Sequence, residues 1–414
     1  MNILKNELHD SPSFGRQLLN KVPEITLLFW IIKVLCTTVG ETFADFLNVN
    51  LNFGLVGTSI TMGVLLIVAL VFQFRSKKYT PWIYWITVVF ISVFGTLVTD
   101  ILTDSIGVPL EATTIFFSIM LMLTFGIWYW KEKTLSIHSI FTKRREIFYW
   151  LTILFTFALG TASGDLMAES LGLGYLVTGI IVAVVIATIV IAQRLKLNSV
   201  LSFWIIYIMT RPLGASIGDL LSQPTKFGGL GLGATVTSVI FLTGILAVVL
   251  YFTFSKKDVI KNAQVEAKED MQGKGLIWQT VITVVIFVVV GGGAYYFRHN
   301  ALQAEAKLAV TTSTPNQNSQ VLSLSPLGDL SDFIKITEDT QKLVIANDLV
   351  GAKTRIADFE YEWDNSQSKL KPMNRAKWTE IDNATDKTLR ELRAVNPTVE
   401  GSKSALDILL NTLK

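Results

Sequence analysis

The sequence is poor in charge, in sulfur and in imidazole. Of its 414 residues, 17% are charged, one is a cysteine (Cys36) and three are histidines (His9, His138 and His299). One cysteine excludes an internal disulfide framework and a thiolate metal cluster. The histidines lie outside the apolar runs, which argues against a zinc or copper site built from histidine within a membrane. Residues 1–23 are polar and lack the basic-then-apolar pattern of a signal peptide.

The sequence also lacks the motifs of common enzymes. We find no nucleophile–base set, no phosphate-binding loop and no HExxH motif. We therefore expect neither an enzyme nor a bound organic cofactor. The net charge of +3 comes from basic residues concentrated in particular connections, a pattern that indicates membrane orientation and not nucleic-acid binding.

Long apolar runs dominate the sequence instead. Half of the residues are hydrophobic and the mean hydropathy is +0.47, which excludes a chain of ordinary soluble domains. A helix of about 20 residues crosses a hydrocarbon core of about 30 Å. Nine stretches meet this length, and we predict membrane spans near residues 24–46, 55–74, 82–103, 108–130, 146–166, 173–193, 200–221, 232–254 and 276–297.

The connections between these spans alternate in charge. Fifteen Lys or Arg residues occur in the connections 75–81, 131–145, 194–199 and 255–275, whereas the other four connections, at 47–54, 104–107, 167–172 and 222–231, hold only Lys226. The positive-inside rule then predicts a cytoplasmic N-terminus and an extracytoplasmic chain beyond Arg298. This is the topology of a multi-pass protein of a bacterial-type inner membrane. Six tryptophans near predicted cytoplasmic boundaries are expected to be interfacial anchors: Trp82, Trp85, Trp128, Trp130, Trp150 and Trp278.

A motif recurs four times in register with the spans. The pattern G-x-x-x-x-D occupies residues 40–45, 95–100, 160–165 and 214–219. Each copy is followed by a helix breaker (Gly54, Pro109, Gly174 and Gly233) and, four residues later, by threonine (Thr58, Thr113, Thr178 and Thr237). We interpret this as an internal repeat of a two-span hairpin. Because an even number of spans returns the chain to one side, the copies are expected to be parallel and related by rotation about the membrane normal.

The motif stretches resemble a known family. Residues 159–176 (LGTASGDLMAESLGLGYL) and 211–224 (RPLGASIGDLLSQP) are similar to bacterial four-repeat membrane proteins of unknown function, often labelled "uncharacterized membrane-anchored protein". The resemblance covers about residues 20–254. It implies a four-repeat membrane protein and brings no catalytic or binding residues with it.

The four motif aspartates, Asp45, Asp100, Asp165 and Asp219, are the main candidate site. At 1.5 Å per residue they lie about 30 Å from the cytoplasmic start of each helix, at matched depth. A second polar residue stands four positions away on the same helix face in each copy: Glu41, Asp104, Glu169 and Gln223. One interpretation is a ring of acidic ligands that attracts a hard divalent cation of the Mg²⁺, Mn²⁺ or Ca²⁺ type. The other is that each aspartate caps a helix end or faces water.

Two basic residues are predicted near the middle of the membrane. Lys33 and Arg211 lie about 15 Å into their spans, too deep to snorkel easily, so each is expected to point inward and pair with an acid or with helix carbonyls. Three roles remain open for them. They could compensate charge on a transport pathway, form a static ion pair, or, in the case of Arg211, bind an anion.

The C-terminal part differs in composition. Residues 303–327 are polar and read as a linker, and from Leu330 onward apolar residues recur at helical spacing, punctuated by Pro372 and Pro397. Three or four helices are expected there. Their predicted core comprises Leu343, Val344, Leu349, Ile356, Phe359, Trp363, Trp378, Leu389, Leu392 and Leu409. An acidic run with Asp358 and Glu360 is either a solvated helix face or a weak cation-collecting surface.

These observations predict an all-α integral membrane protein with four tandem two-helix repeats, a ninth transmembrane helix and a small extracytoplasmic helical bundle. The expected parts are a cytoplasmic segment (1–23), the repeat domain (24–254), a cytoplasmic loop (255–275), the ninth helix (276–297), a linker (298–329) and the bundle (330–414). We expect a transporter or exporter of a small cation, with the lipid bilayer as its other partner. The alternative is a membrane-anchored sensor or scaffold whose bundle performs recognition. The sequence specifies no oligomeric state.

Overall fold

The described part of the chain is entirely helical. The computed structural model describes residues 20–51, 53–222, 230–260, 275–312, 325–371, 373–394 and 396–414. Within these ranges there are thirteen α-helices and no strand, and nine of the helices are long and apolar enough to cross a membrane. This confirms the predicted helical class and the number of candidate spans.

Eight of these helices form four consecutive hairpins. The first helices of the hairpins are α2 (Leu27–Asp45), α4 (Pro81–Asp100), α6 (Lys143–Asp165) and α8 (Ser199–Ser222). The second helices are α3 (Gly54–Arg75), α5 (Leu110–Glu132), α7 (Gly174–Arg194) and α9 (Gly233–Ser255). Local chemistry sets the starts of the first helices: the hydroxyls of Thr26 and Thr142 cap α2 and α6, and Pro81 occupies the first turn of α4.

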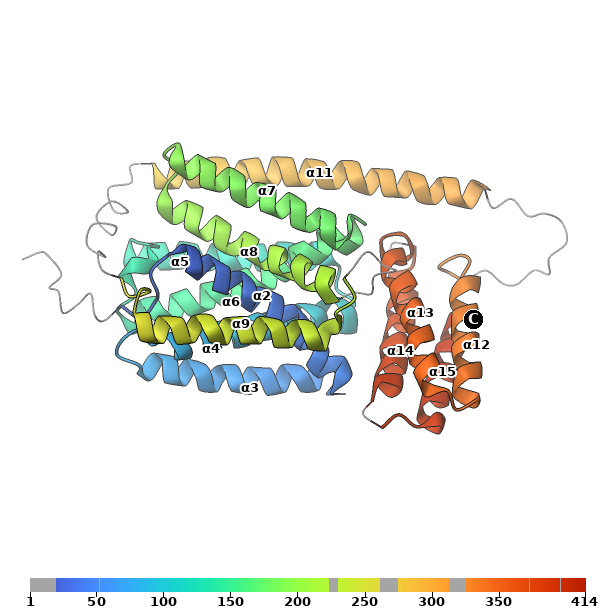
Figure 1. Ribbon diagram of the computed structural model, residues 1–414. Coiled ribbons are helices and arrows are strands. Elements are labelled where there is room, and N and C mark those ends of the chain that lie inside the picture. The colour runs from blue at the N-terminus through green and yellow to red at the C-terminus, as the bar shows by residue number, and fades with distance from the viewer. Residues whose placement is uncertain are drawn as a thin grey trace, which may run out of the picture.

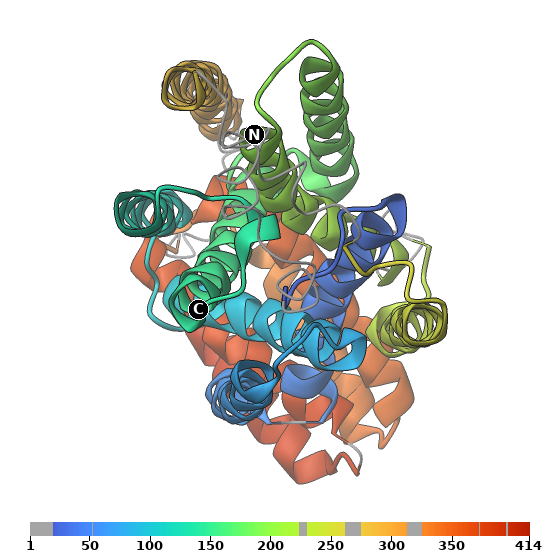
Figure 2. The same cartoon turned by 90° about the vertical axis from the view of Figure 1, so that its left-hand side faces the viewer.

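The first helices lie inside and the second helices outside. Between 56% and 72% of each first span is buried, against 17–28% of each second span. Figure 2 shows the inner helices around a central axis with the outer helices at the periphery. Each inner helix packs against the inner helix of the next hairpin, and α8 returns to α2. Each outer helix covers the inner helix of the following hairpin, with α9 on α2 closing the ring. The four hairpins thus form a closed ring with fourfold pseudosymmetry.

A short π-helix follows the motif aspartate in three hairpins. These segments are η1 (Phe46–Asn50), η2 (Ile101–Ser105) and η4 (Leu166–Ser170). The outer helix then begins at Gly54 in the first hairpin and at Gly174 in the third, and both residues have positive φ angles that favour glycine. We call this end of the ring the aspartate end. The opposite end, which carries connections 76–80 and 133–142, is called the basic end.

The ninth apolar helix, α11 (Leu276–Thr312), runs along the outside of the ring (Figure 1). None of its apolar window is buried. At the basic end, Gln279 Oε1 accepts a hydrogen bond from the Asn198 amide at 2.8 Å, and at the aspartate end Arg298 Nε donates to the Leu171 carbonyl at 2.9 Å. The helix continues to Thr312, beyond the end at residue 297 that hydropathy predicts.

The C-terminal residues form a four-helix bundle against the aspartate end of the ring (Figure 1). Its helices are α12 (Ser331–Ile345), α13 (Leu349–Leu370), α14 (Arg375–Arg393) and α15 (Val399–Leu413). Eight of the ten predicted core residues are in the buried cluster of this bundle, and Leu343 and Leu349 pack on it while partly buried. The stacked indoles of Trp363 and Trp378, 5.6 Å apart, lie in this cluster.

The tryptophans near the basic end divide into two groups. Trp82, Trp130 and Trp278 are exposed, as interfacial anchors should be, whereas Trp85, Trp128 and Trp150 are in the core of the ring. The expectation that all six are anchors is therefore wrong for the second group. The reason is rotational position, because these three indoles face neighbouring helices.

Candidate functional site: the axis of the four-repeat ring

The motif glycines hold the inner helices together. A β-carbon added at any of the four would crowd the residue that lies three positions before the glycine of the next repeat. The crowded residues are Ser92 for Gly40, Phe157 for Gly95, Arg211 for Gly160 and Thr37 for Gly214. The approach is tightest at Gly40 and Gly214, and the nearest distances are 2.5 Å at Gly160 and 3.0 Å at Gly95. These cyclic contacts explain why each copy has glycine there: only a residue without a side chain permits this helix approach.

A ring of aromatic side chains surrounds the axis toward the basic end. Eleven residues before each motif glycine stands Phe or Tyr followed by Trp. The Phe or Tyr of each repeat contacts the Trp of a neighbouring repeat, with ring centroids 5.4–6.2 Å apart: Phe29–Trp85, Tyr84–Trp150, Tyr149–Trp204 and Phe203–Trp30. We call these eight residues the aromatic ring. It was not predicted from the sequence, although the fourfold aromatic pair at constant distance from glycine is a readable signal.

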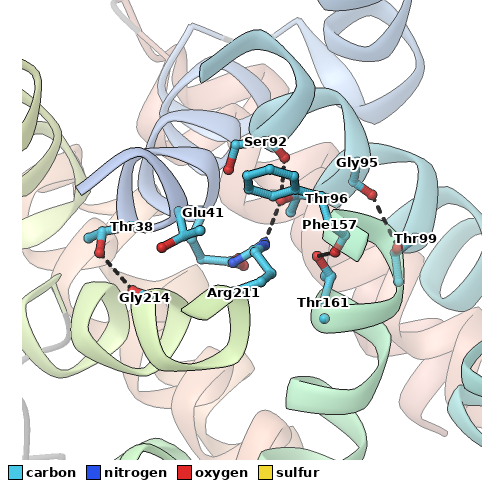
Figure 3. A network of polar contacts seen from close by, with 12 residues as sticks. Thr38, Glu41, Ser92, Gly95, Thr96, Thr99, Phe157, Thr161, Arg211 and Gly214 are labelled. Carbon is cyan, nitrogen blue, oxygen red and sulfur yellow. Dashed lines mark hydrogen bonds and ion pairs between the residues drawn. The ribbon is translucent and has the colours of Figure 1, made fainter. Parts of the chain in front are cut away.

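A buried ion pair crosses the axis between the aromatic ring and the aspartate end. Figure 3 shows Arg211 reaching from α8 toward α2 and α4. Its Nη2 donates to Glu41 Oε2 at 2.5 Å and to Thr96 Oγ1 at 2.5 Å. The arginine side chain is 1% exposed and that of Glu41 is 17% exposed. Within the described residues, Nε and Nη1 of Arg211 have no hydrogen-bond partner. Arg211 therefore pairs with an acid, as its depth predicts.

Lys33 lies deeper, between the ion pair and the aromatic ring. It is 1% exposed, and its Nζ lies 3.8 Å from the ring centroid of Phe157 and 4.3 Å from that of Tyr207. These are cation–π contacts. The equivalent positions in the other repeats are Val88, Ile153 and Tyr207. The charges of Lys33 and Arg211 thus break the fourfold symmetry at two successive layers of the core.

Asp45, Asp100 and Asp165 are the last residues of α2, α4 and α6, and Asp219 lies three residues before the end of α8. Asp45 is exposed, while Asp100, Asp165 and Asp219 are half-buried. In the three described π-helix turns, the side chains of Asp45, Asp100 and Asp165 make no capping hydrogen bond to the segment that follows. A capping role thus does not account for these three carboxylates.

Glu41 lies close to acids of three repeats. It interacts electrostatically with Asp45, Asp165 and Asp219 while pairing with Arg211. The candidate acids of the first, third and fourth repeats therefore lie close enough for their charges to interact. Asp100 joins them through its electrostatic interaction with Asp165.

The remaining candidate residues are placed unequally. Both carboxylate oxygens of Glu169 accept hydrogen bonds at 2.9 Å, one from Tyr175 and one from Gln367. The side chain of Asp104 and the whole of Gln223 lie outside the described residues. Among the described side chains, no three Asp, Glu, His or Cys residues converge closely enough to hold a metal ion directly. The described acids therefore lie near one another at the end of the axis without forming a three-ligand metal site.

Together these features define a four-repeat helical protein with nine helices, in its described part, that are suited to a membrane, and with a polar axis inside the ring. The chain belongs to the family whose model is described as "Repeat of Unknown Function (DUF347)". The model matches four times, over residues 28–79, 83–134, 148–196 and 202–258, one match for each hairpin. This confirms the predicted four-repeat family. Neither a curated protein nor a solved structure matches the chain.

Proposed function

We propose that the ring spans a bilayer with its basic end in the cytoplasm and its aspartate end outside, in a bacterial-type inner membrane. The supporting observation is the contrast between the basic-end connections, which hold fifteen Lys or Arg, and the aspartate-end connections, which hold one. A single cysteine at Lys335, an exposed residue of α12, in a Cys36→Ser background tests this. It should react with an impermeant thiol reagent on intact spheroplasts. Reaction only after lysis of the inner membrane would contradict the orientation.

We further propose that the ring transports a small cation along its axis. The observation that carries this proposal is the position of Glu41, which pairs with a fully buried arginine while facing the aspartates of three repeats. Carboxylates held at the end of an apolar helix bundle attract cations and are costly to retain without a role. The side chains of Asp45 and Asp165 make no capping hydrogen bond to the π-helix that follows each of them.

The ligand chemistry favours a hard divalent cation that keeps part of its water shell. Oxygen ligands without histidine or thiolate favour Mg²⁺, Mn²⁺ or Ca²⁺. Mg²⁺ in particular keeps several waters and needs only one or two carboxylates. That requirement agrees with separated acids that, among the described side chains, do not form a three-ligand cage.

The ion pair supplies a mechanism for charge compensation. While Arg211 holds Glu41, the acid is neutralised and the aromatic ring surrounds the axis beyond it. A cation that reaches Glu41 from the aspartate end competes with the guanidinium for the carboxylate. Release of Arg211, whose Nε and Nη1 have no partner among the described residues, would then couple cation binding to a shift of α8 against α2 and α4.

Purified protein in liposomes tests the transport proposal. Mn²⁺ or Mg²⁺ flux, followed by an enclosed fluorescent indicator, should fall strongly when Asp45, Asp100, Asp165 and Asp219 are all replaced by asparagine. Replacing Asp332 and Asp407, two exposed acids of the bundle, by asparagine is the control and should leave the flux unchanged. Wild-type flux in the fourfold variant at normal protein level would contradict the proposal.

One observation favours a second candidate, a membrane-anchored sensor. The bundle contacts the ring through the hydrogen bond from Gln367 to Glu169, so a ligand bound by either part could be sensed by the other. In that case the liposomes would show no flux of any tested cation, while cation binding would still change the thermal stability of the protein.

A further inference from the structure

The C-terminal bundle lies on the aspartate end of the ring. Helix α13 contacts η4, and α14 contacts η1 and η2. The three π-helices that directly follow Asp45, Asp100 and Asp165 are therefore all touched by the bundle. A β-carbon at Gly107, just beyond η2, would lie 3.4 Å from Thr379 Oγ1 of α14. Side-on, Figure 1 shows α13 and α14 at this end of the ring, with α12 and α15 farther out.

A residue of the bundle, Gln367, hydrogen-bonds to Glu169, one of the candidate ligands. Gln367, which is 5% exposed, donates from Nε2 to Glu169 Oε2 at 2.9 Å. The other oxygen, Oε1, accepts from the Tyr175 hydroxyl at 2.9 Å. A cation that approaches Glu169 must therefore compete with the amide of Gln367.

The bundle also brings charge to the first repeat. Arg393 forms an ion pair with Glu360 and interacts electrostatically with Asp45. Glu360 and Asp386, which are acids, repel the negative charge of the same aspartate. The docked bundle thus brings one cation and two acids close to Asp45.

From these contacts we propose that the bundle is a lid on the aspartate end, held by Gln367 on Glu169, which must undock before ions exchange with Glu169 and the half-buried Asp165. The effect on ion exchange rests on the proposed function, whereas the docking of the bundle on the ring does not. Undocking frees Glu169 Oε2 and removes Arg393 from the field of Asp45. In the described conformation the lid thus covers Glu169, while the exposed Asp45 stays outside its cover.

Cross-linking tests the docking. Cysteines at Thr379 and at Ile106, an exposed residue beside Gly107, are treated with a short cleavable bifunctional thiol reagent. The background is Cys36→Ser with a protease site between residues 313 and 324. After proteolysis the ring and bundle fragments should remain joined on a denaturing gel. The pair Ile106 and Asp407 is the control and should separate, because Asp407 lies on α15, on the far side of the bundle (Figure 1). Separation of the first pair as well would overturn the docked lid.

Accessibility tests closure without any transport measurement. A cysteine at Asp165, which is half-buried beside η4, is labelled with an impermeant maleimide. Gln367→Glu places a second carboxylate against Glu169, and labelling should become about tenfold faster, as expected from losing one hydrogen bond to a charged group in the docked state. Gln341→Glu, the same change on α12, is the control. Equal labelling rates with and without the Gln367→Glu substitution would overturn the lid.

Flux in liposomes then separates the two proposals. Mn²⁺ flux through the Ile106–Thr379 cysteine variant, which keeps Glu169 and Gln367, should stop on cross-linking and return when the reagent is cleaved. Flux that is unaffected by a formed cross-link would overturn the lid and leave cation transport standing. If flux is absent in every preparation while cross-linking and accessibility behave as expected, the transport proposal fails and the lid stands.

Discussion

Arg211 and Glu41 form an ion pair across the axis of the ring, with Nη2 and Oε2 2.5 Å apart and 170 positions between them in the sequence. The pair joins the fourth repeat to the first, which is also where α9 packs on α2 and closes the ring. Breaking a buried pair by removing one partner strands a charge and is strongly destabilising, whereas removing both partners often costs little.

We therefore predict non-additive effects at this pair. Glu41→Gln should lower stability by about 3 kcal/mol, because it leaves the buried guanidinium without its anion. The double variant Glu41→Gln/Arg211→Met should regain most of the loss. The measurement is the thermal midpoint of the detergent-solubilised protein, and Lys143→Met at an exposed position is the control for loss of a cation. Additive losses would show that the two side chains act separately.

Two helical glycines should respond differently to replacement by alanine. Gly160→Ala should destabilise by about 1–3 kcal/mol, because a β-carbon would lie 2.5 Å from Arg211 Cβ and the core would be overpacked. Gly126 is also inside a helix, but nothing lies within 4 Å of its missing β-carbon. Gly126→Ala should be neutral or stabilising because alanine favours the helix by about 1 kcal/mol. Equal midpoints for the two variants would contradict the close helix contact.

The aromatic ring predicts different roles for two neighbouring tryptophans. Trp85 is 1% exposed and contacts Phe29 and Tyr84, while Trp82 is 50% exposed. Trp85→Ala should cost about 3–5 kcal/mol through the cavity that it leaves, and Trp82→Ala should cost little. Thermal unfolding followed by size-exclusion chromatography measures both. A similar loss for Trp82→Ala would mean that anchoring, and not core packing, dominates at this end.

The bundle should lose stability in acid through Asp339. A hydrogen bond from Lys342 and the nearby Arg355 lower the pKa of Asp339 below its usual value. Its stabilising contribution is present above the pKa of the unfolded chain, about 4, and is lost as the pH falls through the lower folded value. A fragment starting at Ser325, expected to fold cooperatively, should therefore melt at lower temperature below about pH 4.

Asp339→Asn should remove part of that pH dependence. Glu362→Gln, which changes the charge of an exposed residue of α13 by the same amount, is the control. Circular dichroism melts between pH 7 and pH 3 provide the comparison. An unchanged acid dependence in Asp339→Asn, or a fragment without helical signal, would refute the assignment.

The sequence correctly predicts the features that depend on hydropathy and on the spacing of residues along one helix. The candidate spans, the G-x-x-x-x-D repeat and the bundle core around Trp363 follow from apolar periodicity, because burial selects the same residue types wherever they occur. Partnerships across the ring could not be predicted in this way. Glu41 lies four residues before Asp45, so helical spacing assigns the two acids to each other, but the structure pairs Glu41 with Arg211.

The aromatic ring escapes prediction for a related reason. Position along a helix indicates depth, and by depth Trp85 and Trp150 lie where interfacial tryptophans are common. Whether a side chain faces lipid or a neighbouring helix depends on its rotation about the helix axis, which hydropathy does not report. Comparison of the four repeats does report it, since the aromatic residues Phe29, Tyr84, Tyr149 and Phe203 stand at one distance from the motif glycine.

The final prediction ranks the four motif aspartates. Asparagine keeps the size and hydrogen-bonding oxygen of aspartate but removes its charge, and the two residues cap helices about equally well. If the carboxylates attract cations, single Asn substitutions should reduce Mn²⁺ flux in liposomes with little loss of protein. The reductions should be largest at Asp45, Asp100 and Asp165, where a second carboxylate stands four residues away, and smallest at Asp219, whose counterpart is the neutral Gln223.

Salt should modulate these differences. The Debye length is about 8 Å at physiological ionic strength and about 3 Å at 1 M, so added salt screens carboxylates that face water. Asp45 is exposed and Asp165 half-buried, so the effect of Asp45→Asn should shrink more in high salt than that of Asp165→Asn. Asp407→Asn in the bundle is the control for a lost surface charge. If Asp219→Asn proves the most harmful, or if all four variants keep wild-type flux at both salt concentrations, the acids do not act as a cation-attracting field.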